Sequence, residues 1–212
     1  MKICGLAEPA GFDAAIASGA DWLGFVFFAA SPRAIRPARA AALSARHPGG
    51  AGRIGLFVRA GDTEIARCLE QVRLDGLQIY DTAERAAEIG ARFGLPVWHA
   101  CAVATASDLP VLAPGLQRLV LESRQPASSD RPGGNGHAFD WSLPRGWQAP
   151  CPWLLAGGLD PENVAAAIQA SGAIAVDVSS GVERQRGVKD PARIAAFIAN
   201  ARAALVSGRP VT

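Results

Sequence analysis

The sequence predicts an α/β protein, a single (β/α)8 TIM barrel that spans residues 1–212. Short apolar runs alternate with alanine-rich helical stretches along the whole chain, which is typical of βα units around a parallel sheet. Eight such runs are present, the number that closes a barrel. The length of 212 residues lies near the lower limit for this architecture. One domain is therefore expected.

The predicted strands are short and apolar, and helices fit between them. They lie at Lys2–Cys4, Trp22–Phe28, Arg53–Val58, Gly76–Tyr80, Pro96–Ala100, Arg118–Glu122, Trp153–Ala156 and Ala173–Val178. An open doubly wound sheet is the alternative architecture, but it needs a glycine-rich dinucleotide turn after the first strand. Residues 4–8 contain no such turn, so the closed barrel is favoured.

Four of the predicted helices have clear limits, at Asp62–Gln71, Thr82–Phe93, Asp160–Ala170 and Pro191–Ser207. The third is expected to begin with Asp160 as its N-cap and Pro161 at its first helical position, where both residue types are favoured. Residues 123–152 are rich in proline, glycine and serine. We therefore expect a long sixth βα loop with a short or irregular helix, and a long loop in a compact barrel is a functional candidate.

Composition excludes several classes of function. The net charge is +2 and the basic residues are dispersed, so nucleic acid is not expected as a partner. The four cysteines lie far apart without a CxxC pair, so neither a zinc site nor a disulfide framework is expected, and a reducing cytoplasmic compartment fits best. The longest apolar run, Trp22–Ala30, is too short to span a membrane. The three histidines lie in different βα units without metal-ligand spacing, so no metal is expected.

Glycine-rich turns follow the last three predicted strands. Glycine allows the backbone to approach an anion closely, and successive N–H groups and helix N-termini then favour negative charge. Barrels commonly hold phosphate in the loops after strands seven and eight. Each turn taken alone is equally compatible with an ordinary tight turn, but three together predict a phosphate site. The candidate phosphate-binding residues are Gly134, Asn135, Gly136, Gly157, Gly158, Ser179, Ser180 and Gly181.

Several motifs occur in order along the whole chain. They are Lys2-Ile3-Cys4-Gly5, Gly24-Phe25-Val26-Phe27 with Ser31-Pro32-Arg33, Phe139-Asp140-Trp141, Ala156-Gly157-Gly158-Leu159, and Val176–Glu183 continued by Gly187–Asp190. In these motifs the chain resembles the phosphoribosylanthranilate isomerases, the barrels of the tryptophan pathway. The resemblance implies an Amadori rearrangement of N-(5-phosphoribosyl)anthranilate to the carboxyphenylamino-deoxyribulose phosphate, without a cofactor. The closed barrel leaves open whether the protein is a monomer or a homodimer.

The resemblance also implies roles for individual residues. Cys4 takes the place of the family's base for the sugar C2 proton, as a thiolate if its pKa is lowered. Glu122 stands where the family has its acid, an aspartate, and the added methylene moves the carboxyl group by roughly 1 Å, a misplacement that can cost about 10²-fold in rate. Arg33 would bind the anthranilate carboxylate and Asp177 would orient the substrate. Simpler interpretations are that Cys4 is a small buried thiol, that Arg33 is a loop cation, and that Asp177 is a buried carboxylate bound by loop N–H groups.

Other strand ends depart from the family pattern, whereas the phosphate loops keep it. The departures are Ala7, Tyr80, Asp81 and His99, which we expect at or near the mouth of the barrel. They suggest two alternatives: a divergent paralogue with Glu122, Asp81 and His99 as a new acid–base set, or a protein that binds a different phosphorylated sugar derivative without turnover. Each also has a simpler interpretation, in which Tyr80 packs against a neighbour, Asp81 caps a helix and His99 makes a hydrogen bond within the barrel.

Overall fold

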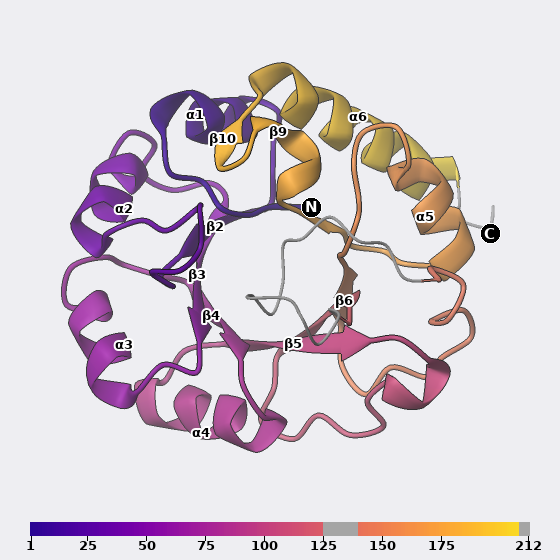
Figure 1. Cartoon of the computed structure of the whole chain (residues 1–212), viewed down its shortest axis with the longest axis horizontal. Helices are drawn as coiled ribbons and strands as arrows, with labels where there is room; N and C mark the ends of the chain where they lie inside the picture. Colours follow the sequence, from indigo (N-terminus) through magenta and orange to yellow (C-terminus); the bar gives the residue numbers. More distant parts are fainter. Residues whose placement is uncertain (125–139, 208–212) are drawn as a thin grey trace.

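The computed structural model describes residues 1–124 and 140–207. In these residues eight parallel strands form a ring with helices around it (Figure 1). Their order is β7-β6-β5-β4-β3-β2-β1-β8, and a parallel bridge between Leu155 and Val176 joins the two ends of the sheet. The predicted closed barrel is therefore confirmed. The strands are β1 Lys2–Ile3, β2 Trp22–Val26, β3 Gly52–Val58, β4 Gly76–Tyr80, β5 Val97–Val103, β6 Arg118–Ser123, β7 Trp153–Leu155 and β8 Asp177–Val178.

The helices lie outside the ring and cover its outer face (Figure 1). They are α1 Pro9–Ala17, α2 Pro37–Ser44, α3 Asp62–Leu69, α4 Ala83–Phe93, α5 Val164–Ser171 and α6 Pro191–Ser207, with 3-10 turns η1 Ala106–Asp108 and η2 Ser180–Val182. After η2, β9 (Glu183–Gln185) and β10 (Val188–Lys189) form a small antiparallel hairpin. Among the described residues, none of the helices combines the length and apolar character needed to cross a bilayer.

Side chains alternate between the two faces of each strand, and this alternation separates two kinds of core. Val97, Cys101 and other outward residues pack with the buried faces of the helices into the large core. Inward residues form two smaller clusters made almost entirely of strand residues, one around Trp98 and Val120 and one around Cys4. Four buried polar side chains share strand positions with these inward residues and so also point into the ring: Lys2, Gln78, Glu122 and Asp177.

The predicted start of α5 is wrong by four residues. The helix begins at Val164, with Asn163 as its N-cap, and residues 161–163 form a turn. Oδ1 of Asp160 accepts hydrogen bonds from the amides of Glu162 (2.9 Å) and Asn163 (2.8 Å), and its carbonyl oxygen accepts one from the amide of Val164 (3.1 Å), so Asp160 makes the capping contacts expected of it. The residues that it caps form a turn, and the regular α-helix begins after that turn.

The connections on either side of β6 lack a regular α-helix in the described residues. Between β6 and β7 the described part, from residue 140, contains only turns, in line with the expected short or irregular sixth helix. The connection from β5 to β6 holds only the 3-10 turn η1, so a second βα unit also lacks its helix. In the part of the chain that the structure describes, the barrel is thus covered by fewer helices than its strand number predicts.

Candidate active site

The structure brings three of the predicted functional residues together inside the ring. Cys4 directly follows β1, Glu122 lies in the last part of β6 and Asp177 begins β8. All three are nearly inaccessible, with exposed fractions of 5%, 9% and 5%. The ammonium group of Lys2 links two of them, since it donates a 2.9 Å hydrogen bond to Oδ2 of Asp177 and also hydrogen-bonds Cys4. A buried cluster of one thiol, two carboxyl groups and an ammonium group results.

Cys4 owes its position to a glycine on the neighbouring strand. A Cβ atom on Gly24 would lie only 2.8 Å from Sγ of Cys4 and 3.0 Å from its Cα atom, so no larger residue fits there without displacing the cysteine. Burial raises the pKa of the Cys4 thiol above its usual value, while the ammonium groups of Lys2 and Lys189 act in the opposite direction. Burial outweighs these charges, so the lowered pKa that the resemblance implied for Cys4 is not found.

Glu122 is poised between its two protonation states near neutral pH. Burial raises the pKa of its carboxyl group to about 7, with a smaller contribution in the same direction from the charge of Asp177. A hydrogen bond from the hydroxyl group of Tyr80 to Oε1 and the charge of Lys2 lower this pKa in part. A carboxylic acid with a pKa near the working pH is well suited to general acid catalysis.

Asp177 has one carboxyl oxygen bound and one without a partner. Oδ2 accepts the hydrogen bond from Lys2, and Oδ1 has no hydrogen-bond partner among the residues that the structure describes. Burial raises the pKa of Asp177, and the adjacent ammonium group of Lys2 opposes this. The simpler interpretation, a carboxylate held by loop N–H groups, is not the arrangement observed, because Lys2 is its partner.

Arg33 is buried and held in one orientation by a residue that the sequence analysis did not select. Its Nε and Nη2 atoms donate hydrogen bonds to the two carboxyl oxygens of Glu183, at 2.6 and 2.9 Å. Glu183 also accepts a 2.8 Å bond from the ammonium group of Lys189. Burial alone would raise the pKa of Glu183, but these bonds outweigh it and lower the pKa to about 2. The interpretation of Arg33 as an ordinary loop cation therefore fails.

The glycine of the first motif makes room for this arginine. Gly5 has a φ of +74°, and a Cβ atom added to it would lie 2.6 Å from Cδ of Arg33. The Arg33–Glu183 pair therefore packs directly on the loop that carries Cys4. The presence of Glu183 and Lys189 in the motifs of the sequence was the one available signal for this network.

The two described glycine-rich loops lie against each other at the ends of β7 and β8. Gly157 and Gly158 have φ values of +80° and +71°, and a Cβ atom on Gly181 would lie 1.9 Å from the carbonyl oxygen of Leu159. Within the described part of the chain, the amides of Gly157, Gly158 and Ser180 donate no backbone or side-chain hydrogen bond. Ser179 instead donates a 3.2 Å bond from its hydroxyl group to the carbonyl oxygen of Cys4. The candidates Gly134, Asn135 and Gly136 lie outside the described residues.

Comparison with known proteins identifies the family. Residues 1–200 match the family model described as N-(5'phosphoribosyl)anthranilate (PRA) isomerase. The chain belongs to this family. It is therefore an intramolecular aldose–ketose isomerase of tryptophan biosynthesis.

Similar proteins cover nearly the whole chain. The isomerase of Rhodospirillum rubrum is 51% identical over 207 residues, covering 93% of this chain and 95% of its own. That of Acidiphilium cryptum is 51% identical over 205 residues, covering 96% and 98%. The crystal structure of the isomerase from Thermotoga maritima is 33% identical, with a TM-score of 0.83 and coverage of 95% and 98%. Another PRA isomerase structure, 32% identical with a TM-score of 0.80 and coverage of 95% and 97%, contains reduced 1-(o-carboxyphenylamino)-1-deoxyribulose 5-phosphate.

The structure does not bring the alternative acid–base set of Glu122, Asp81 and His99 together. His99 shares the outward face of β5 with Val97 and Cys101, so its side chain does not point into the ring with Glu122. Its Nε2 atom lies 2.9 Å from the carbonyl oxygen of Asp81, while Oδ1 of Asp81 accepts a 2.8 Å bond from the amide of Thr82. Thr82, not Asp81, caps α4.

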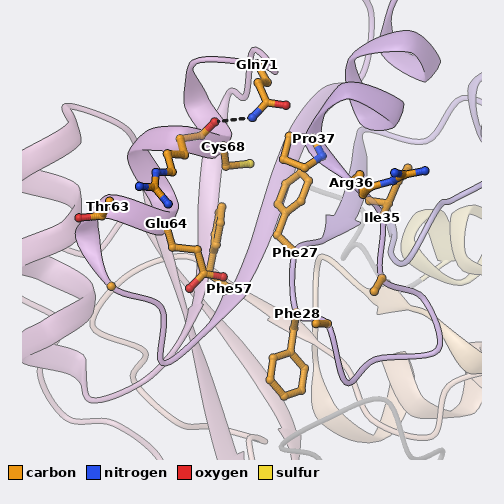
Figure 2. A pocket seen from close by; sticks show the side chains of 14 residues that line it. Phe27, Phe28, Ile35, Arg36, Pro37, Phe57, Thr63, Glu64, Cys68 and Gln71 are labelled. Carbon is orange, nitrogen blue, oxygen red and sulfur yellow. Dashed lines mark hydrogen bonds between the residues drawn. The ribbon is translucent and has the colours of Figure 1, made fainter.

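A cavity of about 740 Å³ lies outside the ring, between the segment after β2 and helix α3 (Figure 2). Phe27 and Phe57 form much of its apolar wall, and Glu64 and Arg67 of α3 and Gln71 of the turn after α3 also line it. None of the predicted catalytic or binding residues lines it. The cavity is therefore separate from the predicted site residues.

Proposed function

We propose that this isomerase rearranges N-(5-phosphoribosyl)anthranilate with Glu122 as its acid and Cys4 as its base. Glu122 donates its proton to the ring oxygen of the ribosylamine, and the ring opens to an imine. The thiolate of Cys4 then takes the proton from C2 of the sugar, and the resulting enol becomes the aminoketone product. The observation that carries this proposal is the shared burial of both groups at the carboxyl ends of β1 and β6, where barrels perform their chemistry.

Lys2 is the group best placed to favour the reactive form of Cys4. Its ammonium group is fully buried, hydrogen-bonds the cysteine and opposes the rise in the thiol pKa. An adjacent cation is a common means of stabilising a thiolate. The pairing of Lys2 with Asp177 keeps the ammonium group charged, since the pKa of Lys2 is raised.

The proposed substrate contacts follow from the arrangement around the cluster. The amides of Gly157, Gly158 and Ser180 donate no hydrogen bond to any described residue, so together with Ser179 and Gly181 they are suited to the phosphate, and we assign Gly134, Asn135 and Gly136 to the same role. Arg33, held in plane by Glu183, would meet the anthranilate carboxylate. Oδ1 of Asp177 would orient the sugar. The bound product analogue of the similar isomerase supports a sugar phosphate carrying an aromatic carboxylate as the ligand.

The compartment and assembly belong to the same proposal. We place the enzyme in the cytoplasm, which is supported by four cysteines that are all free thiols. It acts as a monomer or a homodimer. A dimeric isomerase from Thermotoga maritima, 33% identical with a TM-score of 0.80, supports the second state.

The test is the fall in anthranilate fluorescence when purified protein meets freshly prepared phosphoribosylanthranilate. Cys4→Ala and Glu122→Gln should each lower kcat by about 10²-fold or more, the usual contribution of one acid or base. Because Glu122 must carry its proton, kcat of the unchanged protein should fall as the pH rises through about 7. Full turnover in either variant would contradict that residue's role, and tight binding of the substrate without turnover in the unchanged protein would contradict the catalytic proposal.

A further inference from the structure

Tyr80 reaches across one strand of the barrel to contact Glu122. It ends β4 and packs at the inner cluster of Cys4, Val26 and Leu56, so its ring lies inside the barrel. Between β4 and β6 runs β5, where the inward side of the strand carries the small residues Ala100 and Ala102 at this level. These alanines leave room for the phenol ring, whose hydroxyl group donates a hydrogen bond to Oε1 of Glu122.

A second hydrogen bond fixes the direction of the first. Nε2 of Gln78, a fully buried residue on the same face of β4, donates a 3.2 Å bond to the hydroxyl oxygen of Tyr80. Because Gln78 donates to this oxygen and Oε1 of Glu122 accepts from it, the hydroxyl group is used on both sides, with its hydrogen toward Glu122. Oε1 of Glu122 is thereby an acceptor, and a proton on the carboxyl group must be carried by Oε2.

We propose that Tyr80 is a positioning residue for the isomerase reaction, which holds Oε1 of Glu122 so that Oε2 delivers the proton to the substrate. The inference rests on the proposed role of Glu122 as the acid. A glutamate side chain has three rotatable bonds, and a shift of its carboxyl group by about 1 Å is enough to cost on the order of 10²-fold in rate. The hydrogen bond removes this freedom before the substrate arrives.

Several other groups act on the same carboxyl group from neighbouring elements. Lys2 on β1, Asp177 on β8 and Cys101 on β5 interact electrostatically with Glu122, besides Tyr80 on β4. Of these, Tyr80 alone donates it a hydrogen bond among the described residues, and that bond lowers the pKa of Glu122 from a value already raised by burial. Loss of the hydroxyl group should therefore raise the pKa above about 7.

The kinetic test is Tyr80→Phe, which removes only the hydroxyl group. We expect kcat to fall about 10- to 100-fold with KM nearly unchanged, and the decline of kcat at high pH to move to higher pH. Thr82→Ala is the matched control two residues along the chain, because it removes the cap of α4 and lowers the melting temperature without touching the cluster. It should leave kcat and the pH profile unchanged. Unchanged kcat and pH profile in Tyr80→Phe would overturn the inference.

A spectroscopic test needs no turnover, because Tyr80 is the only tyrosine of the chain. With ¹³Cζ-labelled tyrosine, the single resonance should shift with an inflection near pH 7 that disappears in Glu122→Gln. A resonance that does not titrate, or that titrates equally in Glu122→Gln, would overturn the inference. The two proposals fail separately: full turnover in Glu122→Gln removes the acid role, whereas an inactive Glu122→Gln beside a fully active Tyr80→Phe removes only the positioning role.

Discussion

Glu122 keeps its proton in the folded protein at pH values where an unfolded glutamate has lost it. Its pKa is about 7 in the fold and 4.5 for an unperturbed side chain, because burial disfavours the carboxylate. Between these two values the folded state binds the additional proton. This group's contribution to stability is therefore fully present below about pH 4.5 and is lost as the pH rises through about 7. The same burial that suits Glu122 to acid catalysis destabilises the protein at neutral pH.

Replacing the carboxyl group by an amide removes this cost. We expect Glu122→Gln to raise the free energy of unfolding at pH 8 by on the order of 3 kcal/mol, and to change it little at pH 4.5. Urea unfolding of both proteins at the two pH values measures the difference. An equal effect at pH 8 and pH 4.5 would show that the carboxyl group is not buried as described.

The contact between Gly24 and Cys4 gives a second prediction. In Gly24→Ala the new methyl group would lie 2.8 Å from Sγ of Cys4, so the thiol must move. A displacement near 1 Å should lower kcat by about 10²-fold. The control is Gly61→Ala, where an added Cβ atom meets nothing within 4 Å, so kcat should be unchanged. Steady-state kinetics of the two variants decide the matter, and equal kcat values would contradict a close fit at Gly24.

Single residues were predictable from the sequence where they end a strand, but their partners were not. Cys4, Glu122 and Asp177 lie inside the ring as their places in the predicted strands indicated. The contact of Tyr80 with Glu122 joins residues 42 positions apart, and that of Arg33 with Glu183 joins residues 150 positions apart. Such pairs depend on which side chains the closed ring brings face to face, and a single sequence holds no periodic signal for that.

At the scale of elements, most starts were predicted within one residue, whereas the predicted starts of α5 (Asp160) and of β8 (Ala173) each lie four residues too early. β4 has the predicted limits and α6 ends and begins as expected, because their apolar pattern is regular. Asp160 makes the predicted capping contacts, but the segment that it caps is a turn, so the regular part of α5 begins at Val164. The outward direction of His99 could have been derived, since the apolar residues Val97 and Cys101 lie two positions before and after it and so share its face of β5.

The two loops after β7 and β8 form one unit, and a prediction tests this. A Cβ atom on Gly181 would lie 1.9 Å from the carbonyl oxygen of Leu159, which is backbone and cannot rotate away. Gly181→Ala should therefore separate the loops and raise KM for the phosphorylated substrate about 10-fold or more, the result of losing one or two good hydrogen bonds to a charged group. Inorganic phosphate as a competitive inhibitor should weaken in parallel. An unchanged KM would argue against phosphate binding between these loops.

Across the whole molecule, the Lys2–Asp177 pair joins the first and last strands of the ring. Both side chains are buried, and β1 pairs with β8 at this residue. Lys2→Met leaves a buried carboxyl group without its cation and should lower the free energy of unfolding by roughly 3–5 kcal/mol. The double variant Lys2→Met with Asp177→Leu should recover part of this loss, as seen by denaturant unfolding. A double variant that is less stable than Lys2→Met would contradict the account.

The pairing of the strands also sets an order in which the ring can close. β1 has only two residues, and it meets β8 and β2 on its two sides, while β7 joins β8 through a single bridge at Leu155 and Val176. During synthesis one edge of β1 therefore lacks its partner strand until residue 178 has left the ribosome. In the finished protein the amides near this junction should exchange with deuterium sooner than those of β3 to β5, because fewer bonds must open to expose them. We therefore expect the barrel to open first at this junction.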